Sequence, residues 1–208
     1  MHRIVLPLLT LAGFFAGTAG VSAAAPTEYE TKAGYLLNFV EFVEWPTGTF
    51  QDAASPVIIG IMGKDPFGAE MEKLKDKLVN GRKLQIKRFK GALEFRGAEA
   101  PGRRQENLTF NQAKKLAELK SCHILFISSS EKKYLSMVLK PLRDSCVVTV
   151  GETPVFTREG GIINFLSDGS RVEFEINLDA AERARLKFSS KLLSLAKVVK
   201  SEHSDEKK

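Results

Sequence analysis

Histidine and cysteine are scarce in this chain of 208 residues, which has three histidines and two cysteines. His2 lies in the N-terminal leader and His203 in the charged C-terminal tail, so only His123 belongs to the body of the chain. No pair of histidines has the spacing of a metal-binding motif. The sequence therefore predicts no metal site, and we expect no cofactor.

The common catalytic motifs are missing as well. There is no Gly-x-Ser-x-Gly elbow and no Gly-x-x-x-x-Gly-Lys-Ser/Thr loop. His123 opens an apolar run, whereas open α/β sheets place their active sites where strands end. Glu173 and Glu175 would lie ~7 Å apart on one strand, but nothing beside them indicates a sugar or water site. We expect that the protein is not an enzyme; the alternative is a hydrolase with an unrecognised nucleophile.

Charge of one sign is only slightly in excess. The chain has 31 Lys and Arg against 25 Asp and Glu, a formal net charge of +6. The two signs are interspersed, as in residues 73–77, and no basic stripe with interleaved aromatic residues is present. We therefore expect solvated helix faces and no nucleic-acid partner.

The N-terminus has the pattern of a secretory signal peptide. Arg3 precedes an apolar run from Ile4 to about Phe15, and small residues continue to Ala25. The run is shorter than the ~20 residues that span a bilayer, which argues against the alternative of an uncleaved anchor. We expect a signal peptide over residues 1–25, one domain over 26–200, and a disordered tail over 201–208. The mature protein would be exported, without inserting into the membrane.

Cys122 and Cys146 each open an apolar, strand-like run. Two cysteines in an exported chain favour a disulfide, and neighbouring parallel strands would place both sulfur atoms at the same end of a sheet. The alternative is two buried, free thiols, since bridging adjacent parallel strands strains the preferred Cα separation.

The order of apolar segments predicts the fold class. Short β-branched or continuous apolar runs at 57–62, 83–89, 122–127 and 146–150 predict strands, and segments with helical periodicity at 67–78, 111–119 and 131–142 lie between them. Residues 91–108 are rich in glycine and charge, which indicates a surface insertion. This alternation is typical of a three-layer α/β/α sandwich with a mostly parallel sheet.

The first helix is predicted after a capping box, in which Thr27 and Glu30 satisfy each other's backbone N–H. Pro46 should end it. Aromatic residues widen its apolar stripe until most of the circumference is hydrophobic. We therefore expect this helix, and Trp45 at its end, to contribute to self-association or to a partner interface as well as to the core.

The segment from Gly160 to Val199 predicts a β-hairpin followed by helices. Asp168-Gly169 is the signal for a two-residue turn, which would pair Phe165 with Val172 and Ile163 with Phe174. Asn177 or Asp179 could cap a first helix, and Ser189 or Ser190 a second helix that continues to Val199.

The two faces of this hairpin differ. One is wholly apolar and should pack on the domain body. On the other, Ile162, Leu166, Glu173 and Glu175 combine apolar surface with carboxylates, a composition suited to binding a partner. The alternative is a covering helix, as in a three-layer fold.

Five motifs in this order resemble the YfiR/HmsC-like family of small periplasmic proteins. They are Phe42-Val43-Glu44-Trp45-Pro46, Gly63-Lys64-Asp65-Pro66-Phe67-Gly68, Cys122-His123-Ile124-Leu125-Phe126-Ile127, Val148-Thr149-Val150-Gly151, and the stretch from Gly160 to Val199. Together they cover nearly all of the chain after the leader.

The resemblance implies a regulator without catalysis. Proteins similar to this chain bind the periplasmic domain of a membrane-anchored diguanylate cyclase and inhibit it, which lowers cyclic-di-GMP and biofilm formation, and they act as dimers. Two alternatives remain: a partner of another membrane sensor, such as a histidine kinase, and a periplasmic protein that binds a small ligand. The ligand pocket would lie where parallel strands end, around Gly63–Gly68, Ser128–Ser130 and Gly151–Thr153.

Overall fold

The computed structural model describes residues 25–94, 105–169 and 171–200. The predicted signal peptide and the tail over 201–208 lie outside the described residues, as does most of the predicted insertion. Among the described residues, no helix has the length and hydrophobicity needed to cross a bilayer.

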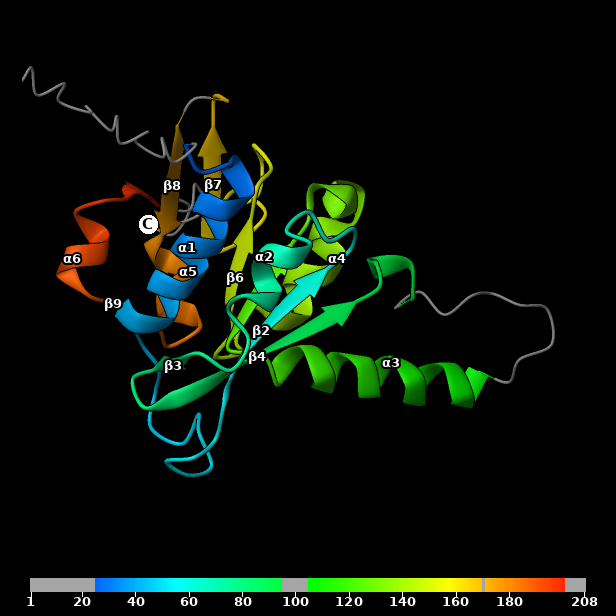
Figure 1. The fold of residues 1–208 in the computed structure, drawn as a ribbon. Helices are drawn as coiled ribbons and strands as arrows, with labels where there is room; N and C mark the ends of the chain where they lie inside the picture. The colour runs from blue at the N-terminus through cyan, green and yellow to red at the C-terminus, as the bar shows by residue number, and fades with distance from the viewer. Residues whose placement is uncertain (1–24, 95–104, 170, 201–208) are drawn as a thin grey trace, which may run out of the picture.

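A mixed, mostly parallel sheet of eight strands forms the centre of the domain (Figure 1). In order across the sheet the strands are β10 (Lys197–Val199), β8 (Val172–Asn177), β7 (Ile163–Ser167), β6 (Val148–Gly151), β5 (Ile124–Ile127), β2 (Val57–Met62), β4 (Arg82–Phe89) and β3 (Leu78–Val79). The five neighbouring strands β7, β6, β5, β2 and β4 are parallel to one another. Strands β7 and β8 pair antiparallel. The predicted parallel sheet with an antiparallel C-terminal hairpin is confirmed.

Helices cover both faces of the sheet, which gives the three layers that we expected (Figure 1). The described helices are α1 (Glu28–Phe42), α2 (Ala69–Glu72), α3 (Gln105–Lys120), α4 (Leu135–Leu139), α5 (Leu178–Arg183) and α6 (Ser190–Leu193), with 3₁₀ turns η1 (Ala92–Glu94), η2 (Ser129–Tyr134) and η3 (Lys140–Leu142). Helices α1, α2, α5 and α6 share one hydrophobic core, and α3 and α4 share the other. Strand β5 separates the two cores and is buried along its whole length, as expected of a central parallel strand.

Helix α1 begins at the predicted capping box. The Thr27 side chain accepts a hydrogen bond from the backbone N–H of Glu30 at 3.2 Å, and the Glu30 carboxylate accepts one from Thr27 N–H at 2.6 Å. The helix ends at Phe42, before Pro46, because Val43 and Glu44 form the short strand β1, which pairs with β9 (Lys187–Phe188).

Aromatic packing joins α1 to the hairpin. The Phe39 ring lies 5.9 Å from that of Phe165 and 5.1 Å from that of Phe174, measured between centroids. Tyr35 contacts Phe174 edge-on at 5.2 Å. The predicted apolar face of the hairpin is therefore buried against the first helix.

Four local predictions were wrong, and in two of them pairing with a strand replaced the predicted helix. The hairpin pairs Phe165 with Phe174, two residues out of the predicted register, since β7 ends at Ser167 and β8 begins at Val172. The segment predicted as a helix to residue 78 stops at Glu72, because residues 76–79 turn back onto β4. The helix predicted over 131–142 is broken into η2, α4 and η3. Residues 197–199 form β10 on the edge of β8 instead of continuing a helix.

Substituting Phe174→Ala should destabilise the domain by about 3–5 kcal/mol, the usual cost of removing a large buried aromatic side chain. Phe174 is 1% exposed. Leu195→Ala is the matched control, since Leu195 is 65% exposed and should change stability by no more than about 0.5 kcal/mol. Urea unfolding followed by circular dichroism measures both; equal midpoints for the two variants would contradict the assigned core.

Candidate functional site

Trp45 belongs to an aromatic stack at the amino end of the central strands. The imidazole of His123 lies 4.5 Å from the Phe50 ring and nearly parallel to it, and Trp45 meets both rings edge-on at about 6 Å. The guanidinium of Arg82 covers the Phe50 ring at 3.9 Å. The stack thus fixes the loop after α1 against the sheet.

Hydrogen bonds hold the same loop. Arg82 donates to the backbone carbonyls of Asp52, Ala53 and Ser55 at 2.7–3.1 Å. His123 Nδ1 accepts the N–H of Ile58 at 3.0 Å, which places the proton of the neutral ring on Nε2. Burial, and next the charge of Arg82, lower the pKa of His123 to about 4. His123 is therefore a neutral structural side chain.

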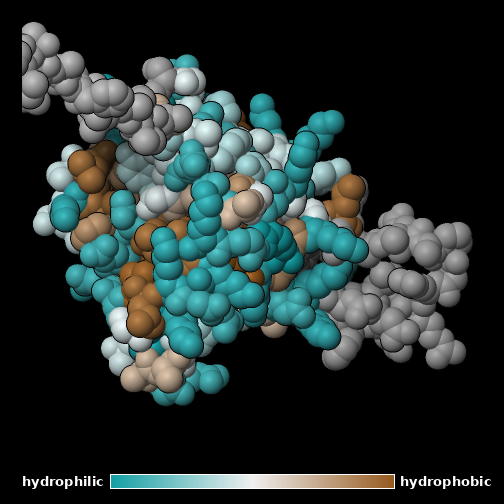
Figure 2. Space-filling model, viewed as in Figure 1, coloured by the Kyte–Doolittle hydropathy of each residue, from teal (hydrophilic) through white to brown (hydrophobic). Residues whose placement is uncertain are grey.

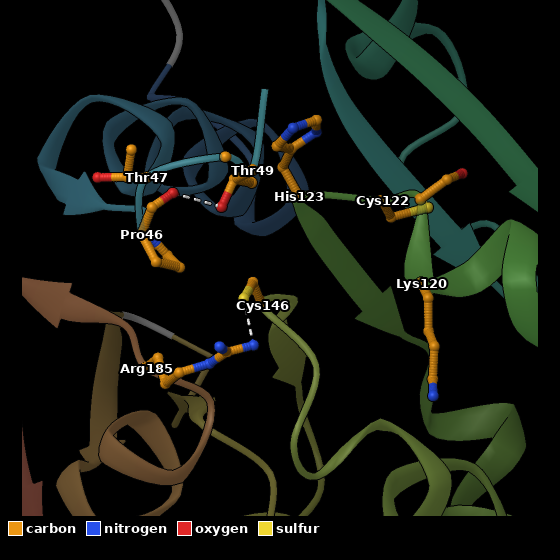
Figure 3. A pocket seen from close by; sticks show the side chains of 10 residues that line it. Pro46, Thr47, Thr49, Lys120, Cys122, His123, Cys146 and Arg185 are labelled. Carbon is orange, nitrogen blue, oxygen red and sulfur yellow. Dashed lines mark hydrogen bonds between the residues drawn. The ribbon is translucent and has the colours of Figure 1, made fainter. Parts of the chain in front are cut away.

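A cavity of about 330 Å³ lies beside this stack (Figure 3). It is lined by residues 46–49, residues 120–123, Cys146 and Arg185. It lies at the amino ends of β5 and β6. The ligand pocket that we expected would lie at the carboxyl ends of the parallel strands. Within the described part of the chain, no three His, Cys, Asp or Glu side chains are grouped to hold a metal ion.

The two cysteines line this cavity as free thiols, so the structure does not contain the disulfide that we expected. Figure 3 shows the two side chains apart, with their sulfur atoms directed differently. Cys122 belongs to the core on the α3 side, where burial raises the pKa of its thiol to about 12. Cys146 is half-buried, and its sulfur accepts a hydrogen bond from Arg185 at 3.6 Å. Both cysteines therefore lie at the amino ends of their strands, but their thiols have different surroundings.

A buried ion cluster that sequence reasoning missed lies at the other end of the strands, where β6 ends. Lys32 on α1 is 2% exposed, and its ammonium lies 2.6 Å from Glu28 and 2.8 Å from Glu152, which directly follows β6. Glu152 also accepts hydrogen bonds from Tyr29 O–H and from Ser129 N–H. Burial lowers the pKa of Lys32, but its two carboxylate partners outweigh that effect and the pKa is raised.

A second cavity, of about 320 Å³, opens beside this cluster. Ser129 and Glu152 line it, so two of the three loops predicted to form a ligand pocket do meet here. Because each charged group of the cluster is already paired, it is better suited to fixing α1 on the sheet than to binding a ligand.

The structure divides the predicted partner-binding residues of the hairpin. Leu166 is half-buried and Glu173 is exposed. Ile162 is 3% exposed and Glu175 is 8% exposed. Glu175 accepts hydrogen bonds from the Thr157 hydroxyl at 2.7 Å and the Asn164 amide at 3.3 Å. Ile162 and Glu175 are therefore largely covered, and their role in binding a partner stays a prediction.

The β6–β7 connection causes this burial. Its Phe156 is fully buried, and a Cβ at Gly151 or Gly161 would collide with the Phe156 ring. Glycine at both positions lets the ring pack directly on the backbone. The connection, instead of a helix, thus covers this part of the sheet.

Comparison with known proteins identifies relatives by sequence and by fold. A family model described as YfiR/HmsC-like matches residues 29–197. No curated protein matches this chain. The fold is similar to the crystal structure of a conserved domain protein from Vibrio cholerae O1 biovar El Tor, with a TM-score of 0.50 and 12% sequence identity. The match covers 83% of this chain and 60% of that one, and at this identity it speaks for the fold alone.

Thiol titration should find one reactive cysteine in the native, unreduced protein and two after unfolding. Cys146 is half-buried, whereas Cys122 is 2% exposed and its thiol has a raised pKa, which suppresses the reactive thiolate. Cys146→Ser should abolish the reaction of the native protein. The absence of reactive thiols in the unfolded, unreduced protein would show instead that Cys122 and Cys146 are bonded.

Stability should fall as the pH decreases from about 6.5 to about 4, in part through His123. The unfolded chain takes up a proton on this side chain near its ordinary pKa of about 6.5, but the folded protein does so only near pH 4. The unfolded state therefore binds more protons in this window. His123→Gln should show a shallower loss over the same interval in chemical denaturation. An unchanged slope would contradict the neutral, buried state of His123.

Proposed function

Since the chain belongs to the YfiR/HmsC-like family, we propose that it is a periplasmic regulatory protein that binds the periplasmic sensor domain of a membrane-anchored diguanylate cyclase and inhibits the enzyme. The observation that carries this proposal is the extent of the family match, which runs from α1 to β10 and so includes both the first helix and the hairpin. The protein acts as a regulator, without catalysis of its own, and its release raises cyclic-di-GMP.

Inhibition of this kind requires the regulator to discriminate between two states of the sensor domain. A partner that shifts a two-state equilibrium from 1:99 to 99:1 must bind the favoured state ~10⁴-fold more tightly. A rigid surface meets this requirement better than a mobile one, because less ordering accompanies binding.

The outer part of the hairpin offers a surface on paired strands, in which Leu166 lies opposite Glu173. Arg171 and Glu173 are exposed and lie 3.7 Å apart, and Leu166 adds half-buried apolar area beside them. An exposed ion pair contributes little to stability, so these charges are free to orient a partner at little cost to the fold. Figure 2 shows a mostly hydrophilic face with small, separate hydrophobic patches, which suits a reversible contact better than an obligate one.

We further propose that the regulator acts as a homodimer, with Trp45 at or near the subunit contact. Trp45 is half-buried, and its indole N–H is buried without a hydrogen-bond partner among the described residues. The part of the indole ring that is open to solvent offers aromatic area to a second chain, and tryptophan is enriched among the residues that dominate binding at interfaces.

The double variant Leu166→Asp/Glu173→Arg should leave the melting temperature nearly unchanged but release the cyclase and raise cellular cyclic-di-GMP. Glu118→Arg, an exposed position on α3 in the other helix layer, is the matched control and should repress normally. If the double variant folds and still represses, the hairpin is not the docking surface. If deleting the gene leaves cyclic-di-GMP unchanged, the proposed function itself fails.

A further inference from the structure

A third cavity, of about 460 Å³, lies between the β6–β7 connection and the edge formed by β8 and β10. Four cationic side chains line it, and each comes from a different segment: Arg143 follows η3, Arg158 lies in the connection, Arg183 ends α5, and Lys200 follows β10. Only two carboxylates, Glu159 and Glu175, face them. The cavity is therefore positively charged overall.

The three arginines have no ion-pair partner among the described residues, in contrast to Arg88, which contacts two carboxylates at 2.7 Å. Leaving guanidinium groups unpaired around a concavity concentrates positive potential there. Guanidinium is also the side-chain group best matched to the oxygen pairs of carboxylate and phosphate. The rim is thus suited to an anionic group.

The floor of the cavity is built differently from the rim. Glu175 and Asn177 are 8% and 1% exposed, and Thr157 is 6% exposed. One oxygen of Glu175 accepts hydrogen bonds from Thr157 and Asn164, while no cation of the described chain pairs with this carboxylate. A buried carboxylate with spare acceptor capacity favours a ligand that donates hydrogen bonds.

We propose that this cavity binds a small hydroxylated anion, whose carboxylate or phosphate lies at the arginine rim and whose hydroxyl groups donate to Glu175. The volume is within the range of small-molecule sites, about 300–1,000 Å³. The site is distinct from the hairpin surface proposed to bind the cyclase and does not depend on that function. None of the residues that line it belongs to the loops at the carboxyl ends of β2 and β5, where we expected a small-ligand pocket.

Four probes test the proposal on the full mature protein by calorimetry and by thermal shift. Glucose 6-phosphate and glucuronate carry both an anionic group and hydroxyls; inorganic phosphate has the anion alone, and glucose the hydroxyls alone. We expect at least one of the first two to bind at least about tenfold more tightly than either control probe, and the stronger of them identifies phosphate or carboxylate as the anionic group. Binding should weaken as salt is added.

Variants locate the site. Arg158→Gln/Arg183→Gln changes two exposed side chains and should weaken binding at least about tenfold without lowering the melting temperature of the free protein. Arg171→Gln, an exposed arginine on the hairpin, is the matched control and should bind normally. Glu175→Gln should reduce the advantage of the hydroxylated anion over inorganic phosphate. Failure of both hydroxylated probes to bind, or equal binding by the double variant and the control, would overturn the proposal.

Discussion

The contact between the aromatic residues of α1 and those of the hairpin joins the two ends of the folded chain. Phe39 is completely buried between Phe165 and Phe174, more than 120 residues away in the sequence. Contacts between residues so far apart in the sequence make this a fold of long-range contacts, which is typical of slower folding.

Most of the architecture followed from local sequence patterns. Continuous apolar runs identify strands such as β2 and β5 because strands buried on both faces need no polar alternation. The hairpin register shifted by two residues, yet the same side chains stayed in the core, since strand faces repeat every two residues. Helix lengths were overestimated where neighbouring strands provided partners. Val199 belongs to a helical pattern in the sequence, but the open edge of β8 gives its backbone a better set of hydrogen bonds.

The sites were less predictable because they depend on residues far apart in sequence. Trp45 stood out as the only tryptophan, but nothing local indicates that Phe50, Arg82 and His123 stack beside it. Alternation along β8 correctly separates Glu175 from the hairpin's apolar face, but it does not show that the β6–β7 connection covers it. The available signal was Gly161 together with Gly151, which permit the close approach of Phe156.

The buried pair of Lys32 and Glu152 constrains how this sequence can vary. Loss of Lys32 would leave the Glu152 carboxylate buried without a cation, at a cost of about 3–5 kcal/mol, and loss of Glu152 would leave Lys32 with Glu28 as its one remaining carboxylate partner among the described residues. Replacing both Lys32 and Glu152 with apolar residues of similar volume can be nearly neutral. The two positions are separated by 120 residues, yet substitutions at them should be strongly non-additive. Among homologous sequences, positions 32 and 152 are therefore expected to change together, and an alignment would show the docking of the first helix as a covarying pair.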